Sequence, residues 1–116
     1  MIPASVERIG KAAFKGCSKI ENVSIPDSVC IIELGTFMEC RNLATAHIGS
    51  GVTNIGSTAF YGCHRLASIV IPDGVVAIGR SAFIGCTNLA SVSIGSGVRS
   101  IDASAFEICK KLDPLV

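Results

Sequence analysis

The sequence predicts a repeat solenoid, in which short parallel strands stack turn upon turn around one continuous core. The first observation is a fixed period of 23 residues that no insertion interrupts. The second is that the residues recurring at this spacing are mostly apolar. A unit of this length has too little apolar surface to enclose a core alone, so neighbouring units must bury it between them. We expect a mostly β structure with a parallel sheet on one side and short 3₁₀ or α turns elsewhere.

Residues that hold the same place in successive repeats form what we call columns. All five phenylalanines lie on one column, and five of the six cysteines lie on another. Because strands of a parallel sheet stand roughly 4.8 Å apart, each column predicts a ladder of like side chains through the core. The apolar columns are Phe14, Phe37, Phe60, Phe83 and Phe106; Cys17, Cys40, Cys63, Cys86 and Cys109; Val6, Val29, Val52, Val75 and Val98; Ile9, Ile32, Ile55, Ile78 and Ile101; Ile20, Leu43, Leu66, Leu89 and Leu112; and Ile25, Ile48, Ile71 and Ile94.

The columns predict a single domain over residues 1–116 that holds about five repeats. Their bounds are 6–28, 29–51, 52–74, 75–97 and a partial 98–116. No polar capping unit is visible at either end, and Pro114 is at best a crude stop. Solenoids need such caps, so we expect a fragment of a longer array whose end repeats expose core residues and favour end-to-end self-association.

The first repeat illustrates the expected strand. Within residues 20–26, Val23 and Ile25 alternate with Asn22 and Ser24. Alternation with a period of two indicates a half-buried strand with the apolar residues inward. The proline that follows Ile25 ends this strand.

Other parts of the repeat predict shorter elements. Residues 29–32 predict a second short strand on another side of the coil. The stretch around Ala13 and Phe14 is too short for a long helix and predicts a single helical or 3₁₀ turn. The second repeat carries Glu33 and Glu39 on columns that hold Gly elsewhere. Glu adopts positive φ poorly, so these columns are not all expected to require it.

The composition excludes several classes of function. The chain is 49% hydrophobic and 16% charged, and its net charge of +1 gives no electrostatic case for nucleic acid or an anionic membrane. With no Trp and one Tyr, a platform for stacking bases is also unsupported. No run approaches the ~20 apolar residues of a membrane helix. The sequence therefore predicts no membrane span, no nucleic-acid partner and no cofactor.

The cysteines predict buried, reduced thiols. The chain has no C-x-x-C pair, and a spacing of 23 residues is no zinc pattern. Adjacent repeats bring the Cα atoms within reach of a disulfide, so disulfides remain an alternative. Parallel side chains and an odd number of column members argue against them, and free Cys packs well as a small hydrophobe. Cys30 lies off the column and is the one thiol expected to be reactive.

No catalytic or metal-binding constellation is found. His47 and His64 lie on different columns without a Cys, Asp or Glu partner at ligand spacing, so both are interpreted as surface residues. The carboxylates are scattered, and no G-x-S-x-G elbow occurs. The Gly-Ser-Gly segments at residues 49–51 and 95–97 predict turns rather than a phosphate loop, because no G-K-[ST] follows. The sequence predicts no catalytic residue, no metal ligand and no enzyme.

Two motifs carry a family resemblance. They are I-x-x-V-x-I-P at residues 20–26 and V-x-x-I-G-x-x-A-F-x-G-C at residues 52–63, and the second recurs along essentially the whole chain. This pattern resembles the leucine-rich-repeat family, in particular its BspA-like subclass. The resemblance implies a right-handed superhelix and a non-enzymatic surface protein of anaerobic bacteria or parasitic protists. It also implies cell adhesion or recognition of a host extracellular-matrix or surface protein, and a cell-surface or secreted location, although no secretion signal is visible.

The outward strand columns are the candidate partner-binding site. Their residues are Asn22, Ser24, Thr45, His47, Ser68, Val70, Ser91 and Ser93. Small polar side chains on a long regular face suit a broad, shallow protein contact better than a small-molecule pocket. The same Ser and Thr content leaves open an alternative, a structural spacer within a long surface array.

Two more columns are candidates for contacts. A basic edge is expected from the residues after each column cysteine, and its members are Arg41, His64 and Lys110, with Lys19, Arg65 and Lys111 beside them. A solvated face is the alternative for this edge. The column after Phe holds Met38, Tyr61 and Ile84 in consecutive repeats. These residues predict either an exposed apolar patch or packing against the neighbouring repeat.

Overall fold

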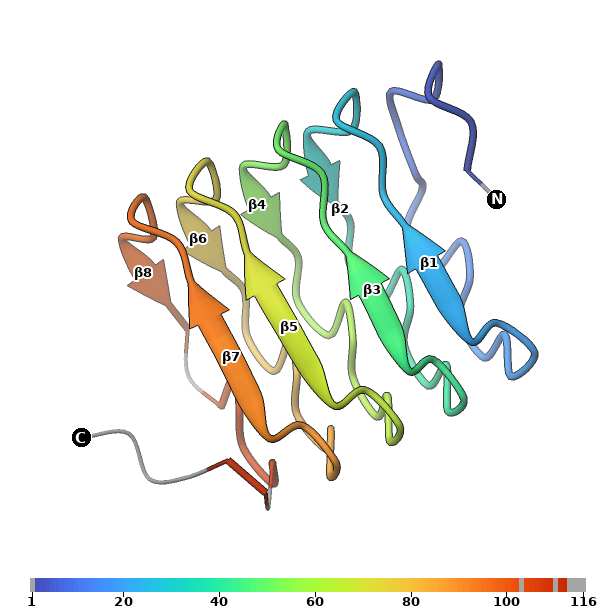
Figure 1. Cartoon of the computed structure of the whole chain (residues 1–116), viewed down its shortest axis with the longest axis vertical. Coiled ribbons are helices and arrows are strands. Elements are labelled where there is room, and N and C mark those ends of the chain that lie inside the picture. Colours follow the sequence, from blue (N-terminus) through green and yellow to red (C-terminus); the bar gives the residue numbers. More distant parts are fainter. Residues whose placement is uncertain (1, 103, 110, 113–116) are drawn as a thin grey trace.

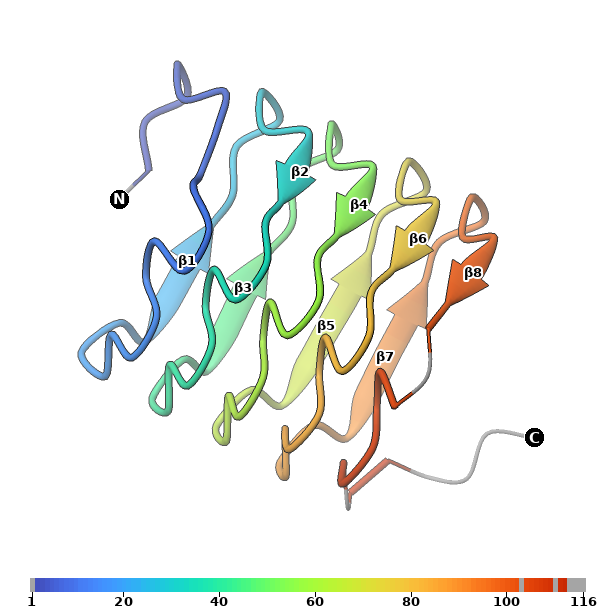
Figure 2. The same ribbon diagram turned by 180° about the vertical axis from the view of Figure 1, so that it is seen from behind.

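The protein is described by a computed structural model that covers residues 2–102, 104–109 and 111–112. Lys110 and Pro114 therefore lie outside the described residues. The chain winds into a solenoid whose turns, here called rungs, lie side by side (Figures 1 and 2). The described part contains strands and turns, and it holds no helix long and apolar enough to cross a membrane.

The strands lie on two sides of the coil. The broad face carries the longer strands, and the narrow face carries the two-residue strands (Figures 1 and 2). In chain order the strands are β1 (Asn22–Ser24), β2 (Ile31–Ile32), β3 (Thr45–His47), β4 (Asn54–Ile55), β5 (Ser68–Ile71), β6 (Ala77–Ile78), β7 (Ser91–Ile94) and β8 (Ser100–Ile101). The broad face consists of β1, β3, β5 and β7, and the narrow face of β2, β4, β6 and β8.

All strand pairs are parallel and keep the period of the sequence. Asn22 pairs with Thr45 and Ile32 with Ile55, in each case one repeat further along the chain. The narrow face is one sheet with the order β2-β4-β6-β8, whereas the broad face comprises two separate pairs, β1-β3 and β5-β7. The parallel-sheet solenoid predicted from the columns is confirmed.

The phenylalanine column forms a continuous stack through the core. Neighbouring ring centroids are 5.1–5.4 Å apart, and three of the four ring pairs are within 3° of parallel. The rings of Phe37, Phe60 and Phe83 are fully buried. We number the rungs by these residues, so that Phe14 lies in rung one and Phe106 in rung five.

The cysteine column forms a second ladder, held by hydrogen bonds between rungs. The thiol of Cys63 donates to the carbonyl oxygen of Phe37 at 3.3 Å, and that of Cys86 donates to Phe60 at 3.2 Å. In the same way, Cys40 donates to the carbonyl oxygen of Phe14 and Cys109 to that of Phe83, each in the preceding rung. All six cysteines are free. The thiols therefore both fill the core and satisfy backbone acceptors.

The side of the coil around each phenylalanine is a chain of turns, so the predicted helical or 3₁₀ turn is wrong. Lys15 N donates to Ala12 O at 3.1 Å, which closes a turn, while Phe14 N donates to Thr36 O of the next rung at 2.9 Å. Ala12 has a φ of 54°. This left-handed backbone interrupts any helix and directs alternate N–H groups to the neighbouring rung.

As expected, the two glycine columns do not both require positive φ, but the column of Glu39 does. Its φ is 58°, that of Ile108 on the same column is 60°, and Gly62 on this column has a φ of 69°. Positive φ is thus required throughout this column, and Glu39 adopts it because its N–H donates to Tyr61 O at 2.6 Å in the next rung. The expectation holds only for the column of Glu33, where no positive φ occurs in the described residues.

Two apolar residues depart from the core prediction. Ile94 is 41% exposed and Ile101 is 43% exposed, although both lie on columns that are buried in earlier rungs. No described rung lies over them, so nothing covers their side chains on that side. The remaining interior members of these columns, such as Ile55 and Ile71, are buried as predicted.

Candidate functional site

The eight residues predicted for partner binding all lie on the broad face with exposed side chains. They come from β1, β3, β5 and β7, two from each strand. In β5 the buried Ile69 and Ile71 alternate with the exposed Ser68 and Val70. This alternation brings the eight side chains onto one surface because successive residues of a strand point to opposite faces.

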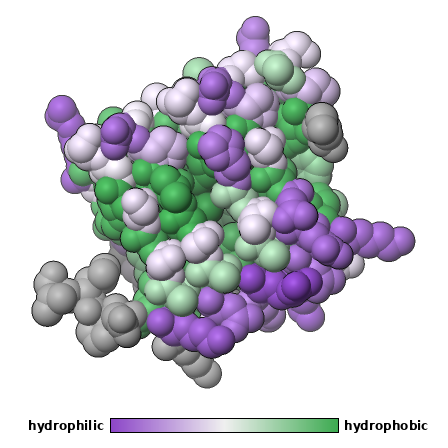
Figure 3. All heavy atoms as spheres, viewed as in Figure 1, coloured by the Kyte–Doolittle hydropathy of each residue, from purple (hydrophilic) through white to green (hydrophobic). Residues whose placement is uncertain are grey.

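The exposed side chains of the broad face are mostly small and polar, but they include one large apolar residue. Val70 is 64% exposed and is the most exposed large hydrophobic residue of the described chain. The hydroxyl of Thr45 donates to Asn22 Oδ1 on the neighbouring strand. Figure 3 looks onto this face, where hydrophobic and weakly polar spheres mix over the strands and hydrophilic spheres gather toward the lower right.

The basic edge follows the turns that lead into the broad-face strands. The side chains of Lys19, Arg41, His64, Arg65 and Lys111 are exposed. No ion pair or hydrogen bond holds Arg41 or His64 within the part of the chain that the structure describes. These groups are therefore available to solvent or to a partner.

The column after phenylalanine combines the two alternatives that the sequence left open, an exposed apolar patch and packing against the neighbouring repeat. Tyr61 is 36% exposed, whereas Met38 and Ile84 are half-buried. Each side chain thus packs in part against its neighbours and shows the remainder to solvent. The three residues form a partly exposed apolar strip.

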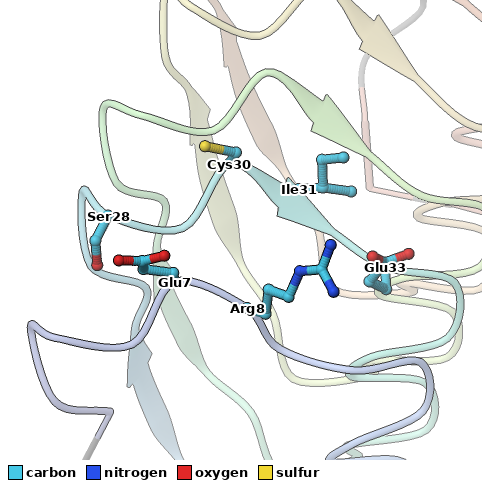
Figure 4. Close-up of a pocket in the computed structure, with 6 residues that line it drawn as sticks. All are labelled: Glu7, Arg8, Ser28, Cys30, Ile31 and Glu33. Atoms are coloured by element: carbon cyan, nitrogen blue, oxygen red, sulfur yellow. The ribbon is translucent and has the colours of Figure 1, made fainter.

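Cys30 is exposed, in agreement with its position off the core column. It lines a surface hollow of about 310 Å³ with Glu7, Arg8, Ser28, Ile31 and Glu33. In Figure 4 its sulfur points toward the side of the hollow on which Ser28 and Glu7 lie. Neither histidine of the chain lines this hollow, so no imidazole is placed to activate the thiol.

The four buried column thiols are poor nucleophiles. Burial raises the pKa of Cys63 far above its ordinary value and raises that of Cys86 to about 12, because desolvation disfavours the thiolate. Burial also raises the pKa of Cys40 and Cys109. Since the thiolate is the reactive form, these cysteines are structural.

The described residues hold no cluster that suggests metal or acid–base chemistry. No group of three or more His, Cys, Asp or Glu side chains could bind a metal ion there. No buried polar side-chain atom of that part lacks a hydrogen-bond partner. What the molecule offers is surface: one exposed strand face, one basic edge and one partly apolar strip.

Sequence reasoning missed two features of this surface. The first is the exposure of Ile94, a residue of a core column that no described rung covers. The hollow beside Cys30 brings Arg8 and Glu33 together from neighbouring rungs. A signal for the second existed, since Glu33 lies one period and two residues after Arg8, but the sequence gave no indication of the direction of these long side chains.

Comparison with models of known protein families identifies one matching family. Residues 1–113 match the family described as BspA type leucine rich repeat region, in six copies. The comparison with curated proteins found no match.

Solved structures with the same fold are also found. A leucine-rich repeat protein from T. pallidum has a TM-score of 0.86 and 35% identity, covering 88% of this chain and 48% of that one. A leucine-rich repeat protein from Bacteroides ovatus has a TM-score of 0.87 and 38% identity, covering 96% of this chain and 29% of that one. A leucine rich cell surface protein from Faecalibacterium prausnitzii has a TM-score of 0.69 and 35% identity, covering 71% of this chain and 21% of that one.

The chain spans less than half of the length of each of these three structures. Repeats of this kind generally form protein-interaction modules and are generally non-enzymatic. The recurring signature, the stacked columns and the family match over residues 1–113 lead to one conclusion. The chain belongs to the BspA-type leucine-rich repeat family.

Proposed function

We propose that this chain is a protein-binding module of a cell-surface or secreted protein, and that it takes part in adhesion or in recognition of a host protein. The observation that carries the proposal is the broad face, where eight exposed side chains from four parallel strands form one surface. A regular surface without a deep pocket suits a protein partner. The description of the F. prausnitzii neighbour as a cell surface protein supports the location.

Within this face, the contact is expected to centre on Val70. Its side chain is 64% exposed and is flanked in β5 by the exposed Ser68. On the neighbouring β7, Ser91 and Ser93 pair with these two residues in register. Val70 is the large apolar side chain among the eight residues, so its burial against a partner would remove the most apolar surface from water.

The test replaces Ser68 by Glu and Val70 by Arg in one variant. Binding to a panel of purified mammalian extracellular-matrix proteins is measured by biolayer interferometry. We expect a partner that binds the wild type to lose at least about tenfold in affinity, because two long charged side chains then stand at the centre of the contact. The melting temperature should hardly change, since both positions are exposed.

The matched control places the same charges on the opposite side of the coil. Thr53→Glu with Val76→Arg changes an exposed hydroxyl residue and a 39% exposed valine beside the narrow face. This control should bind like the wild type. Equal loss in both variants would contradict a contact through the broad face, and binding to no member of the panel would contradict adhesion to extracellular matrix.

A structural spacer is the second candidate. It is favoured by the composition of the broad face, where six of the eight side chains are Asn, Ser or Thr. Such residues offer few anchors for a partner. If no partner is captured and the Ser68 and Val70 variant behaves like the wild type in every assay, the spacer function is supported.

End-to-end self-association is proposed as an additional contact. A surface hollow of about 410 Å³ lies at rung one, where Ile2, Phe14, Ile20 and Val23 contribute apolar side chains. Exposed core residues of a solenoid tend to pack against a further unit. Sedimentation velocity over a range of protein concentrations should show a rising average mass, and a constant monomer would contradict this contact.

A further inference from the structure

A groove on the turn side of the solenoid lies apart from the broad face. Its volume is about 240 Å³, and residues from rungs two to five line it. The lining residues are Glu39, Arg41, Tyr61, Gly62, His64, Ile84, Gly85 and Ile108. None of the eight residues of the broad-face site belongs to it.

The floor of the groove is formed by two glycines on the positive-φ column. Gly62 and Gly85 have no side chain, whereas Glu39 and Ile108 flank them on the same column and lie at the two ends of the groove. Three rung spacings of ~4.8 Å separate these ends, which gives a groove roughly 14 Å long. An extended peptide advances ~3.3 Å per residue, so about four residues fit between them.

The glycines are not required here by backbone conformation alone. Glu39 and Ile108 adopt the same left-handed backbone with φ values of 58° and 60°. A Cβ atom at Gly85 would meet Gly62 Cα at 3.7 Å and Gly62 N at 3.8 Å, and both distances are ordinary contacts. The fold therefore has room for side chains at these positions, and their absence is what leaves the groove open.

The two walls of the groove differ in chemistry. One wall consists of Tyr61 and Ile84, part of the apolar strip after phenylalanine, and Ile108 at the end is 54% exposed. The other wall carries the guanidinium of Arg41 and the imidazole of His64. Neither group has a partner within the described residues. A guanidinium pairs well with a carboxylate, and Arg65 and Lys111 nearby add positive charge along the same edge.

We propose that this groove binds an extended segment of a partner protein in which an aliphatic or aromatic residue lies beside acidic residues. The apolar side chain packs between Tyr61 and Ile84, and a carboxylate of the segment accepts hydrogen bonds from Arg41 and His64. The contact is independent of the broad face.

The test uses a fluorescein-labelled octapeptide of Glu and Ser with one central Phe, and fluorescence anisotropy as the readout. A contact of this size supports a dissociation constant on the order of 10–100 µM. One control peptide has every Glu replaced by Gln, and another has the Phe replaced by Ser. We expect each control peptide to bind at least about tenfold more weakly, because each lacks one of the two contacts.

Filling the groove tests its location. Gly85→Asn should weaken binding of the octapeptide at least about tenfold, because the new side chain occupies the floor, and Asn tolerates positive φ better than other residues with a side chain. The matched control is Gly16→Asn on the same column, where φ is 72° and a Cβ meets nothing within 4 Å. Gly16 does not line the groove, so this variant should bind like the wild type.

Reversing a charge tests the basic wall. Arg41→Glu should abolish the preference for the Glu peptide over the Gln peptide, while Arg99→Glu, which changes the net charge equally outside the groove, should keep it. The variant with Ser68→Glu and Val70→Arg should bind the octapeptide normally, which separates this proposal from the broad-face site. Equal binding of all three peptides, or unchanged binding by Gly85→Asn, would overturn the proposal.

Discussion

The two faces of the solenoid differ in how their strands are joined. On the narrow face, β2, β4, β6 and β8 form one hydrogen-bonded sheet. On the broad face, β3 and β5 lie side by side in both ribbon views, yet they are not paired, so the face comprises two strand pairs (Figures 1 and 2). The core and the narrow face therefore provide the continuity of the structure, and the broad face is built in units of two rungs.

The corners that follow the broad-face strands repeat in the same two-rung unit. A Pro-Asp corner follows β1 and β5, whereas a Gly-Ser-Gly corner follows β3 and β7. Within each unit the two corners are joined, since Ser50 N donates to Asp27 Oδ1 at 2.8 Å and Ser96 N donates to Asp73 Oδ1 at 2.9 Å. The glycines allow this close stacking, because a Cβ at Gly97 would lie 2.0 Å from Asp73 O.

This difference teaches that a strict sequence period does not ensure equivalent contacts between all rungs. The phenylalanine stack reflects it as well. Phe37 lies in the rung of β3 and Phe60 in the rung of β5, so this ring pair spans the step at which the strands are unpaired. The two rings are inclined by 15°, whereas the other ring pairs are within 3° of parallel. The core adapts to the step without a break.

The largest expected effect comes from cutting the stack that both faces share. Phe60→Ala removes a fully buried ring whose neighbours lie 5.3 Å and 5.1 Å away. We expect a loss of about 3–5 kcal/mol in the free energy of unfolding, from lost burial and the cavity left behind. Denaturant melts measure it.

Phe106 provides the control, since its ring is only half-buried. Phe106→Ala should cost clearly less than Phe60→Ala in the same melts. Equal losses at the two positions would contradict the idea that stacking from both sides makes the interior rings more important.

A smaller effect is expected from separating the corners of one unit. Gly97→Ala places a Cβ against the carbonyl oxygen of Asp73, and such overpacking typically costs about 1–3 kcal/mol. Amide hydrogen exchange should rise in β5 and β7 more than in β1 and β3, because only the second unit is changed. Gly10→Ala is the control, since a Cβ there meets nothing within 4 Å. An equal rise in both strand pairs would show that the units are not independent.

The cysteine ladder should respond more weakly still. Cys63→Ala removes a buried sulfur and its hydrogen bond to Phe37 O, with an expected cost of about 1–2 kcal/mol. Cys30→Ala, at an exposed position, should be nearly neutral. In the native wild type, a thiol reagent should label Cys30 long before the four buried cysteines. Fewer than six thiols in denaturant without reductant would indicate disulfides and contradict the free ladder.

Much of this fold could be predicted from the sequence because its period is strict. Columns of Phe, Cys and Ile can be buried in only one way once rungs stack, and Val23 and Ile25 alternate clearly with Asn22 and Ser24. The same alternation exposes the residues of the broad-face site, whose role in binding stays a prediction.

The turn side could not be predicted in this way. Thr58 and Ser81 have positive φ. The single glycine on their column among the described residues, Gly35 in rung two, was too weak a signal to predict it. Inter-rung hydrogen bonds hold this backbone, and such bonds depend on stacking that no local pattern encodes. The groove between Glu39 and Ile108 follows from that backbone, so it too was hidden. The alternation of Pro-Asp and Gly-Ser-Gly corners was visible, but its consequence for strand pairing was not.

The smallest expected effect is a pH dependence at the corner of the first unit. The hydrogen bond from the backbone N–H of Ser50 holds the pKa of Asp27 below its ordinary value of 3.8, and the Ser50 side chain and His47 act in the same direction. Because the folded-state pKa is lowered, the stabilisation is complete above the ordinary value and is lost as the pH falls through the lowered one. Asp27→Asn should therefore melt at a lower temperature than the wild type at pH 6, and this difference should shrink as the pH falls from 4 toward 2. Glu7→Gln, which changes an exposed carboxylate without a hydrogen bond in the described residues, is the control and should follow the wild type over that range. A difference between wild type and Asp27→Asn that stays constant with pH would mean that the charge of Asp27 does not join the two corners, and that the shape of the Gly-Ser-Gly turn alone holds the unit together.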